Sequence, residues 1–536
     1  MRSQIVRGTI ALRRQKRSGD RWHEVPDEVY MNIKDAKNYI EDTVRLYLKK
    51  DEFGEYRIPV VRQRPVFLLG APGIGKTAIM EQIAQELGIA LVSYSMTHHT
   101  RQSALGLPFI EHKTYAGEEY SVSEYTMSEI IASVYETMEK SGIREGILFL
   151  DEINCVSETL APSMLQFLQY KVFGRHQVPE GWVIVTAGNP PEYNKSVREF
   201  DVVTLDRLKI LNVDADYGAW KKYARTRGIH GAITSYLELN KDDFYVMETV
   251  SSGKSYVTAR GWEDLSQILI LYEEEGLKPS EELVGQYLRN ERVVREFTAY
   301  YDLYNKYKND YDAAKILAGD YSENTVTKAK EAAFDERLSL MGLLVSEILS
   351  GMADVNRKGD MIKTVFPVLK AIKNGQGGSA EKILSDLIEA RRRKTDSLKA
   401  AGALSDEEKK FARILTKFYE RCIEAVGKAK AEAVGSSFSD EEIFDTIRSC
   451  FNEEKTSLEK DVETIRDGLH NAFEFIKEAF GEGNEMLVLL TELTVSEVGT
   501  KFLSDFGSED YNRYSSEMMM TDKNAEILDE IGKLNL

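Results

Sequence analysis

Short apolar runs alternate with helix-like patterns through the first part of the chain. The runs, each five to seven residues long, lie at 65–70, 91–96, 146–152, 182–188 and 209–213. Patterns with the apolar spacing of an amphipathic helix lie at 32–48, 77–87, 126–141 and 157–170. Continuous apolar strands separated by amphipathic helices are typical of a parallel sheet covered on both faces. We therefore predict an α/β domain built on a five-stranded parallel sheet.

The strand pattern ends near residue 213. A few helices are predicted between 216 and 275, and a nearly continuous helical pattern follows from 280 to the end. Glycine-rich breaks interrupt it at 375–379 and 435–437. The predicted organisation is a basic segment at 1–31, the α/β domain at 32–213, a small helical domain at 214–279, and an all-α region, of one or two subdomains, at 280–536.

A phosphate-binding loop is predicted between the first strand and the next helix. The segment GAPGIGKT, from Gly70 to Thr77, matches the pattern G-x-x-x-x-G-K-[ST] in the strand–loop–helix context that this motif requires. Its glycines allow backbone amides to face phosphate oxygens, and the helix N-terminus adds its positive end. Lys76 can reach the β- and γ-phosphates, and the Thr77 hydroxyl can bind Mg²⁺. The predicted nucleotide-binding residues are Gly70, Pro72, Gly73, Ile74, Gly75, Lys76, Thr77 and Ala78.

Two acidic residues end the third predicted strand. In ILFLDE, four apolar residues precede Asp151 and Glu152. The carboxyl end of this strand is expected beside the phosphate loop in a sheet of this kind. Asp151 is therefore predicted to hold Mg²⁺ together with Thr77, and Glu152 to orient or activate the attacking water. The expected cofactors are ATP and Mg²⁺.

The order of five motifs resembles the AAA+ ATPases and, within them, the MoxR-like branch. The motifs are GAPGIGKT, ILFLDEIN, TAGNPPEYN, TLDRL and TARGW, and the resemblance covers roughly residues 30–275. It implies that Asn189 is sensor 1, that Arg207 is an arginine finger acting on a neighbouring subunit, and that Arg260 is sensor 2 in a helical lid at 214–279. Arg198 is the alternative finger. Arginine suits such positions because its fork binds phosphate oxygens.

Two further segments resemble features of this branch. The segment 97–125, with Gly117 in a predicted hairpin turn, is similar to an insert that extends toward the pore of a ring. The segment 170–182 is similar to the hairpin that precedes sensor 1, but it is short for that feature, and a plain connecting turn is the alternative interpretation.

Composition narrows the setting in which the protein works. Among its 536 residues, 42% are hydrophobic and 29% are charged. No uninterrupted apolar run approaches the ~18 residues of a membrane span, so we expect no membrane segment. Three cysteines, at 155, 422 and 450, form no C-x-x-C pair, which favours free thiols in a reducing compartment. We expect a cytoplasmic protein, for which a bacterial cytosol fits best.

The resemblance implies a hexameric ring that remodels or matures a partner complex, with a protein that carries a von Willebrand factor A domain. One alternative is a nucleic-acid motor, such as a loader, a helicase or a restriction-type NTPase. The basic start of the chain and the run Arg391–Lys394 favour it, although we expect that run to cap a helix C-terminus. The net charge of −18 opposes it and makes a nucleic-acid partner unlikely. Another alternative is a nucleotide-binding scaffold with negligible turnover. The phosphate loop itself does not distinguish ATP from GTP.

Overall fold

A computed structural model describes residues 30–98, 102, 104, 106–193, 197–198, 200–250, 253–374, 379–432 and 439–517. Most of the basic segment predicted at 1–31 therefore lies outside the described residues. The chain divides into two compact units. The first comprises Met1–Ile83, Leu91–Glu136 and Arg144–Asp216, and the second comprises Ala84–Ala90, Thr137–Ile143 and Tyr217–Leu536.

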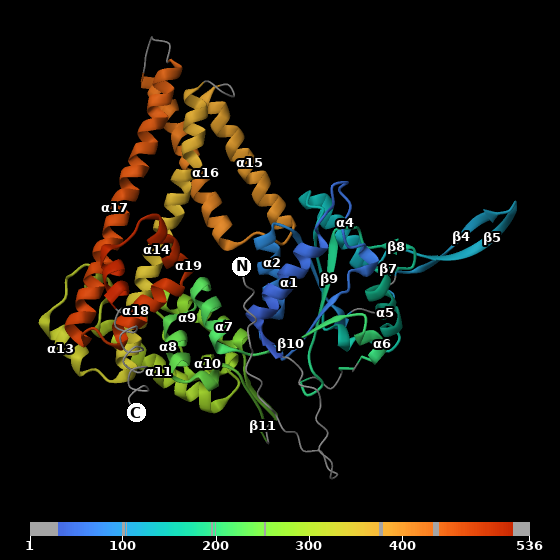
Figure 1. The fold of residues 1–536 in the computed structure, drawn as a ribbon, viewed down its shortest axis with the longest axis horizontal. Helices are drawn as coiled ribbons and strands as arrows, with labels where there is room; N and C mark the ends of the chain where they lie inside the picture. The colour runs from blue at the N-terminus through green and yellow to red at the C-terminus, as the bar shows by residue number, and fades with distance from the viewer. Residues whose placement is uncertain are drawn as a thin grey trace, which may run out of the picture. The chain divides into compact units, whose positions relative to one another are not determined.

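A six-stranded sheet forms the centre of the first unit (Figure 1). Its order is β1-β10-β2-β9-β6-β3, and the neighbours from β1 to β6 pair in parallel. The strands are β1 (Tyr30–Asn32), β2 (Val66–Gly70), β3 (Ala90–Ser95), β6 (Gly146–Asp151), β9 (Trp182–Gly188) and β10 (Lys209–Asp214). All seven residues of β9 are buried, as expected for a parallel strand that is covered on both faces.

The predicted α/β core is confirmed, but the predicted number of strands was wrong. The additional strand is β1, which pairs with β10 at the edge of the sheet. It has three residues, of which Tyr30 is exposed and the others are half-buried. A strand so short, with no buried residue, produces no recognisable apolar run in the sequence.

Helices flank these strands in the chain. They are α1 (Ile33–Tyr47), α2 (Lys76–Leu87), α4 (Glu129–Ser141), α5 (Ala161–Tyr170) and α6 (Val202–Leu205). Helix α1 begins where the Asn32 side chain accepts a hydrogen bond from the Asp35 amide, and its buried face includes Ile40 and Val44. The side-chain cap satisfies a backbone donor that the helix itself leaves unpaired.

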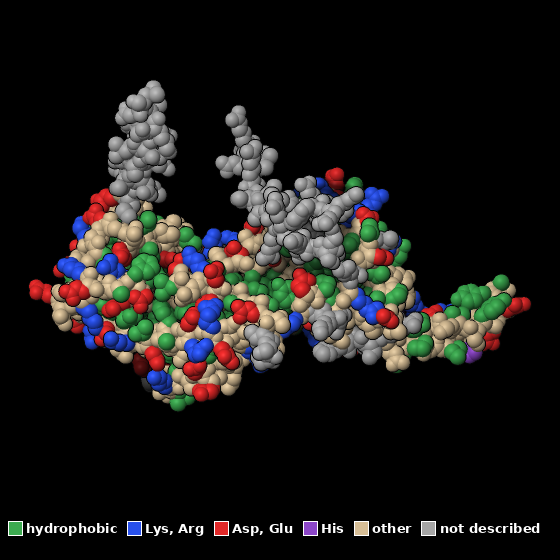
Figure 2. All heavy atoms as spheres, turned by 90° about the horizontal axis from the view of Figure 1, so that it is seen from below, with side chains coloured by type: hydrophobic (Ala, Val, Ile, Leu, Met, Phe, Trp, Pro, Cys, Tyr) green, Lys and Arg blue, Asp and Glu red, His purple; other side chains and the backbone are tan. Residues whose placement is uncertain are grey.

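A long hairpin extends from the first unit, formed by β4 (Pro108–Tyr115) and β5 (Glu118–Tyr125) (Figure 1). Its strands pair in register around the predicted turn at Gly117, which has φ 89°, and Ala116 has φ 53°. Two left-handed residues match the twist of the flanking strands. Exposed hydrophobic side chains gather toward its end (Figure 2), where the rings of Tyr115 and Tyr120 lie 6.2 Å apart and are about half exposed.

The base of this hairpin is joined to a second, much shorter hairpin. Strands β7 (Val172–Phe173) and β8 (His176–Gln177) have two residues each, in the segment predicted at 170–182. Arg175, between them, forms an ion pair of 2.5 Å with Glu124 of β5. The His176 ring also lies 3.2 Å from the Tyr125 carbonyl oxygen. The short hairpin therefore braces the long one.

The second unit is mostly helical, as predicted, but it contains one hairpin that was not predicted. Strands β11 (Val246–Val250) and β12 (Gly253–Val257) pair antiparallel inside the segment 214–279, which was predicted to be a small helical domain with a few helices. Each strand has five residues, and apart from Val257 none of their described residues is buried. Because the apolar residues of VMETV and GKSYV do not alternate with polar ones, the hairpin shows no clear strand pattern in its sequence.

The helices of the second unit range from five to 41 residues. They are α7 (Tyr217–Arg227), α8 (Gly231–Leu239), α9 (Ala259–Glu274), α10 (Glu281–Tyr287), α11 (Glu291–Asp310), α12 (Ala313–Leu317), α13 (Glu323–Glu331), α14 (Phe334–Lys373), α15 (Ala380–Ala400), α16 (Asp406–Glu432), α17 (Asp440–Phe480), α18 (Asn484–Val495) and α19 (Glu497–Asp505). Helix α17 begins with a reciprocal capping box between Ser439 and Glu442, which satisfies two unpaired backbone donors at once.

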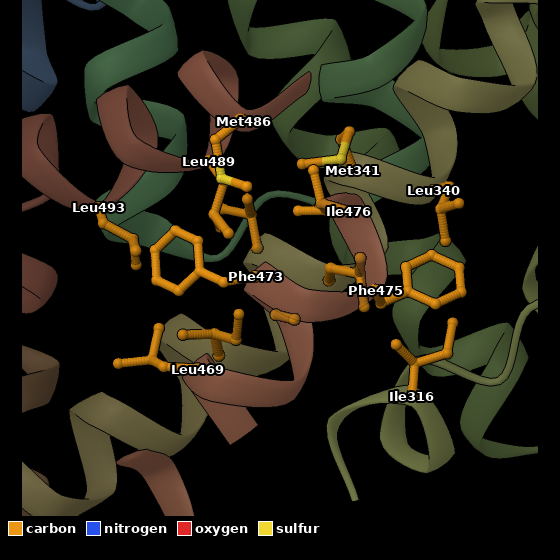
Figure 3. Packing of buried hydrophobic residues seen from close by; sticks show 14 of the residues in the cluster. Ile316, Leu340, Met341, Leu469, Phe473, Phe475, Ile476, Met486, Leu489 and Leu493 are labelled. Carbon is orange, nitrogen blue, oxygen red and sulfur yellow. The ribbon is translucent and has the colours of Figure 1, made fainter. Parts of the chain in front are cut away.

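Two separate cores form along the same pair of long helices, α14 and α17. One core gathers residues from both helices with α18 and α19, and Phe473, Leu469 and Leu489 lie within it (Figure 3). The other core joins the remaining parts of α14 and α17 to α15 and α16, and it includes Leu384 and Phe418. Each long helix therefore belongs to two hydrophobic clusters in succession.

The basic run Arg391–Lys394 does not lie at a helix C-terminus, which corrects the prediction. It lies inside α15, which continues to Ala400. Arg391 and Lys394 each form an ion pair of 2.8 Å with Glu408 of α16. The run therefore belongs to an ion-paired contact between two helices.

Among the described residues, only α14 is long and apolar enough to cross a membrane by length and composition. Packing in the core shared with α18 and α19 accounts for the apolar composition of α14. Its residues Leu340, Leu344, Ile348 and Met352 are all buried there. The helix does not indicate a membrane protein.

Replacing Phe473 tests the first of these cores. The ring is fully buried, so Phe473→Ala should lower the free energy of unfolding by about 3–5 kcal/mol through lost burial and the cavity left behind. Phe334, at the start of α14, is 73% exposed, and Phe334→Ala is the matched control. Urea unfolding followed by circular dichroism should show a lower midpoint for the first variant only. Equal midpoints would contradict the packing in Figure 3.

Candidate functional site

The phosphate loop joins β2 to α2, and its glycines are required for two different reasons. Gly73 and Gly75 have φ of 74° and 97°, a region that other residues adopt only with strain. Gly70 is instead limited by space, because a Cβ there would lie 2.5 Å from the carbonyl oxygen of Val213 in β10. The neighbouring strand thus fixes the start of the loop, and its turn depends on the other two glycines.

Lys76 connects this loop to the end of a second strand. Its side chain is buried, and its ammonium donates hydrogen bonds of 2.8 Å to the carbonyl oxygens of Gly70 and Ala71. It also donates a bond of 2.9 Å to Oδ1 of Asn189, which follows β9. The predicted phosphate-binding lysine and the predicted sensor residue are therefore in direct contact.

Thr77 and Asp151 meet at the same edge of the sheet. The Thr77 hydroxyl, in the first turn of α2, lies 3.2 Å from Oδ2 of Asp151 at the end of β6. Hydroxyl and carboxylate oxygens are ligands that suit Mg²⁺, which usually keeps several waters or phosphate oxygens besides one or two carboxylates. Among the described residues no group of three or more His, Cys, Asp or Glu could hold a metal. The pair fits a nucleotide-bound Mg²⁺ and not a site made by the protein alone.

Glu152 has a backbone conformation that is rare for its residue type. Its φ of 55° lies in the left-handed region, which is unusual for a residue with a side chain. Its carboxylate accepts a hydrogen bond of 3.0 Å from the Ser95 hydroxyl at the end of β3, and another from the Thr97 hydroxyl. Hydroxyl groups from the neighbouring strand therefore hold this side chain.

Sequence reasoning did not identify Ser95 and Thr97. A usable signal existed, because Ser95 ends the strand that lies next to β6 in the sheet and Thr97 follows it. The order of strands was needed to recognise it.

Negative charge beside the site also affects Cys155, which lies four residues after the end of β6. Partial burial, together with the carboxylates of Glu152 and Asp151, raises the pKa of the Cys155 thiol. The thiolate, which is the nucleophilic form, is therefore disfavoured at Cys155.

Arg207 lies at the opposite edge of the sheet from the phosphate loop. It precedes β10, whose first residue, Lys209, pairs with the first residue of β2, whereas Val213 pairs with Gly70. Lys209 and Val213 are four residues apart along β10, which corresponds to about 13 Å. The Arg207 side chain has no ion pair with any residue in the described part of the chain. Arg207 therefore lies at the other end of β10 from the phosphate loop of its own chain.

The short helix α6 before Arg207 is fixed by a cap. Asp201 accepts a hydrogen bond of 2.8 Å from the Thr204 amide. Hydrogen bonds from the side chain and amide of Thr204, and more weakly the charge of Arg207, hold the pKa of Asp201 below its ordinary value.

The other two predicted arginines differ in their surroundings. Arg198 is exposed and forms an ion pair of 2.6 Å with Glu158, and its backbone amide donates to the carbonyl oxygen of Asn154, at 2.9 Å. Arg260 is exposed in the first turn of α9, after the capping residue Thr258, and belongs to the second unit. Its role as sensor 2 stays a prediction.

The remaining loop residues have structural positions that fit the motif. Ile74 is buried, Pro72 is half-buried, and Ala78 lies in the first turn of α2. The structure thus brings together the loop, Asp151 and Asn189, and places Glu152 directly after Asp151. It does not bring Arg207 to them.

Replacing Gly70 tests the loop geometry. In Gly70→Ala the new methyl group would meet the Val213 carbonyl, so the loop or β10 must shift and its amides lose their alignment. We expect at least about tenfold weaker ATP binding, measured by titration with a fluorescent ATP analogue. Gly427 of α16 has open space around its Cβ position, so Gly427→Ala should bind as the unaltered protein does. Equal affinity of both variants would show that the loop is not held against β10.

Comparison with known proteins identifies the domain that contains this site. Residues 66–204 match the family model described as ATPase family associated with various cellular activities (AAA). No curated protein matches the chain. The matched segment begins with β2 and ends in α6, so it contains the loop, Asp151, Glu152 and Asn189. The chain therefore carries an AAA ATPase domain, and Arg207 and Arg260 lie beyond the match.

Proposed function

We propose that this chain is an ATP-hydrolysing motor of the MoxR-like type that works as a ring. The proposal that the chain hydrolyses ATP rests on four side chains that come together at one site. Lys76 contacts Asn189, and Thr77 contacts Asp151, at the carboxyl edge of one sheet. The choice of ATP over GTP rests on the AAA domain.

Each of the side chains at the site would have a separate role in the transfer of the phosphoryl group to water. Mg²⁺ held at Thr77 and Asp151 would neutralise charge on the phosphate oxygens. The Lys76 ammonium adds a fixed positive charge at the loop, and Asn189 beside it can orient the attacking water. Glu152 can accept a proton from that water once its carboxylate leaves the hydroxyls of Ser95 and Thr97.

The position of Arg207 supports a role in a neighbouring subunit. Because it precedes Lys209, which lies about 13 Å along β10 from the residue paired with Gly70, it is available to the site of another copy. A finger supplied across an interface makes turnover depend on assembly, since its loss typically costs ~10³–10⁵ in rate. Arg198 is less suited, because its guanidinium is already paired with Glu158.

We infer that the client is a protein complex, and that the partner carries a von Willebrand factor A domain. The partner rests on the resemblance to the MoxR-like branch alone. The exposed β4–β5 hairpin fits the pore-directed insert of that branch, and the second unit offers a large helical surface for docking. Sensor 2 at Arg260 and a hexameric state belong to the same proposal.

A nucleic-acid motor is less well supported. The run Arg391–Lys394, which favoured it, is engaged with carboxylates, since Arg391 and Lys394 both pair with Glu408. The chain also has a net charge of −18, and negative charge opposes binding to phosphates.

Mixing two inactive variants tests the shared site. Arg207→Ala lacks the proposed finger, and Glu152→Gln lacks the proposed base. In a randomly mixed ring, about a quarter of the interfaces combine an intact finger with an intact base. We expect the equimolar mixture to release phosphate from ATP far faster than either variant alone.

Gel filtration of each variant with ATP, and of the mixture, provides the control for assembly. Failure to recover turnover, with both variants assembled and bound to ATP, would refute a finger at Arg207 that acts between subunits. Turnover by Arg207→Ala alone at the unaltered rate would refute it as well.

A further inference from the structure

A buried side-chain amide, that of Asn154, connects the turn that follows Glu152 to Asn189. Asn154 lies two residues after Glu152 in the 3-10 helix Ile153–Cys155, and the residue is 4% exposed. Its Nδ2 donates a hydrogen bond of 2.9 Å to the backbone carbonyl oxygen of Asn189. Asn189 in turn accepts from Lys76 through its own side chain. A continuous line of contacts therefore runs from the Glu152 turn to the phosphate-loop lysine.

The backbone of Asn154 extends this connection to a third segment. Its carbonyl oxygen accepts a hydrogen bond of 2.9 Å from the Arg198 amide. One residue thus holds the segment after β9 at two places, at Asn189 and at Arg198.

The amide of Asn154 packs closely against Gly188. A Cβ at Gly188, the last residue of β9, would lie 2.5 Å from its Oδ1 and 2.7 Å from its Cγ. The absence of a side chain at Gly188 is therefore what admits the amide. Its position is set by packing as well as by its hydrogen bond.

Stability alone does not explain an asparagine here. Its Oδ1 is buried and has no hydrogen-bond partner in the described part of the chain. A buried acceptor without a partner is unfavourable, and an apolar side chain of similar size would avoid that cost. The hydrogen bond from Nδ2 to Asn189 is the interaction that only the amide supplies.

We propose that Asn154 is a positioning residue for ATP hydrolysis that acts through Asn189. It holds the Asn189 backbone so that the side chain of Asn189 stays beside Lys76, and it couples this position to the turn that carries Glu152. The base and the water-orienting amide are then fixed relative to each other. This inference rests on the proposed ATP hydrolysis, and it adds a residue that is not among those proposed to bind nucleotide or Mg²⁺.

Asn356 provides a matched control. It is also a buried asparagine, its Nδ2 donates 2.9 Å to a backbone carbonyl oxygen, that of Val498, and its Oδ1 has no partner in the described residues. It lies in α14 of the second unit. Asn154→Ala and Asn356→Ala therefore each remove a hydrogen bond from a buried amide to a backbone carbonyl oxygen. The first variant does so beside the site, and the second does so in the second unit.

We expect Asn154→Ala to lower kcat by about 10–100-fold, because small displacements of reacting groups carry penalties of this size. The KM for ATP should change by less than about threefold. Asn356→Ala should leave both parameters unchanged. A kcat for Asn154→Ala equal to that of the unaltered protein, with the unaltered protein active, would overturn the inference and leave the proposed function intact.

A double-mutant cycle separates positioning from a general structural effect. If Asn154 acts through Asn189, Asn154→Ala combined with Asn189→Ala should be no slower than Asn189→Ala alone. Additive losses in kcat would contradict the inference.

Asn154→Asp keeps the shape of the side chain and tests the donor directly, also if Asn154→Ala fails to fold. Burial and the neighbouring carboxylates should raise the pKa of the new carboxyl group, and only its protonated form can donate to the Asn189 carbonyl oxygen. Turnover by Asn154→Asp, relative to the unaltered protein, should therefore increase as pH falls through the pKa of that group. A ratio that stays constant while the new carboxyl group becomes protonated would contradict a role for the donated hydrogen bond.

Discussion

The geometry of the site depends on one constraint, the common direction of the strands β2, β9 and β6. Because neighbouring strands are parallel, their carboxyl ends lie at one edge, and each supplies polar groups there. Lys76 then connects two of these ends through its bond to Asn189. The close approach of Gly70 to Val213 fixes the loop against the next strand. The same direction of the strands places Arg207 at the other edge, away from its own loop, which is why its proposed role requires a second copy of the chain.

The second unit is organised by the two long helices α14 and α17 rather than by a sheet. Each helix contributes to one core with α18 and α19 and to another with α15 and α16. Ion pairs such as Arg391–Glu408 join the helices of the second core at its surface. The apolar length of α14, which by composition could span a membrane, is used for this packing.

The sequence was most informative where a local pattern of residues identifies one element by itself. The phosphate loop, the apolar strands and the helical half of the chain all carry strong local patterns, and the AAA domain and the helical region agree with them. The edge strand β1 and the hairpin β11–β12 escaped prediction because they are short and bury almost no side chains. Ser95, Thr97 and Asn154 escaped for another reason. Their contacts join segments that are far apart in the chain, such as Ser95 with Glu152, so the order of the strands had to be known first.

The central claim is that the four convergent side chains hydrolyse ATP, and steady-state phosphate release tests it most directly. The purified chain should release phosphate from ATP in the presence of Mg²⁺, at a rate per subunit that rises with protein concentration as copies assemble. Asp151→Asn should reduce that rate by at least about 100-fold, since it removes the only carboxylate proposed to hold the metal. An unaltered chain that binds ATP, yet releases phosphate no faster than Asp151→Asn at any concentration, would contradict the account and identify a nucleotide-binding scaffold instead.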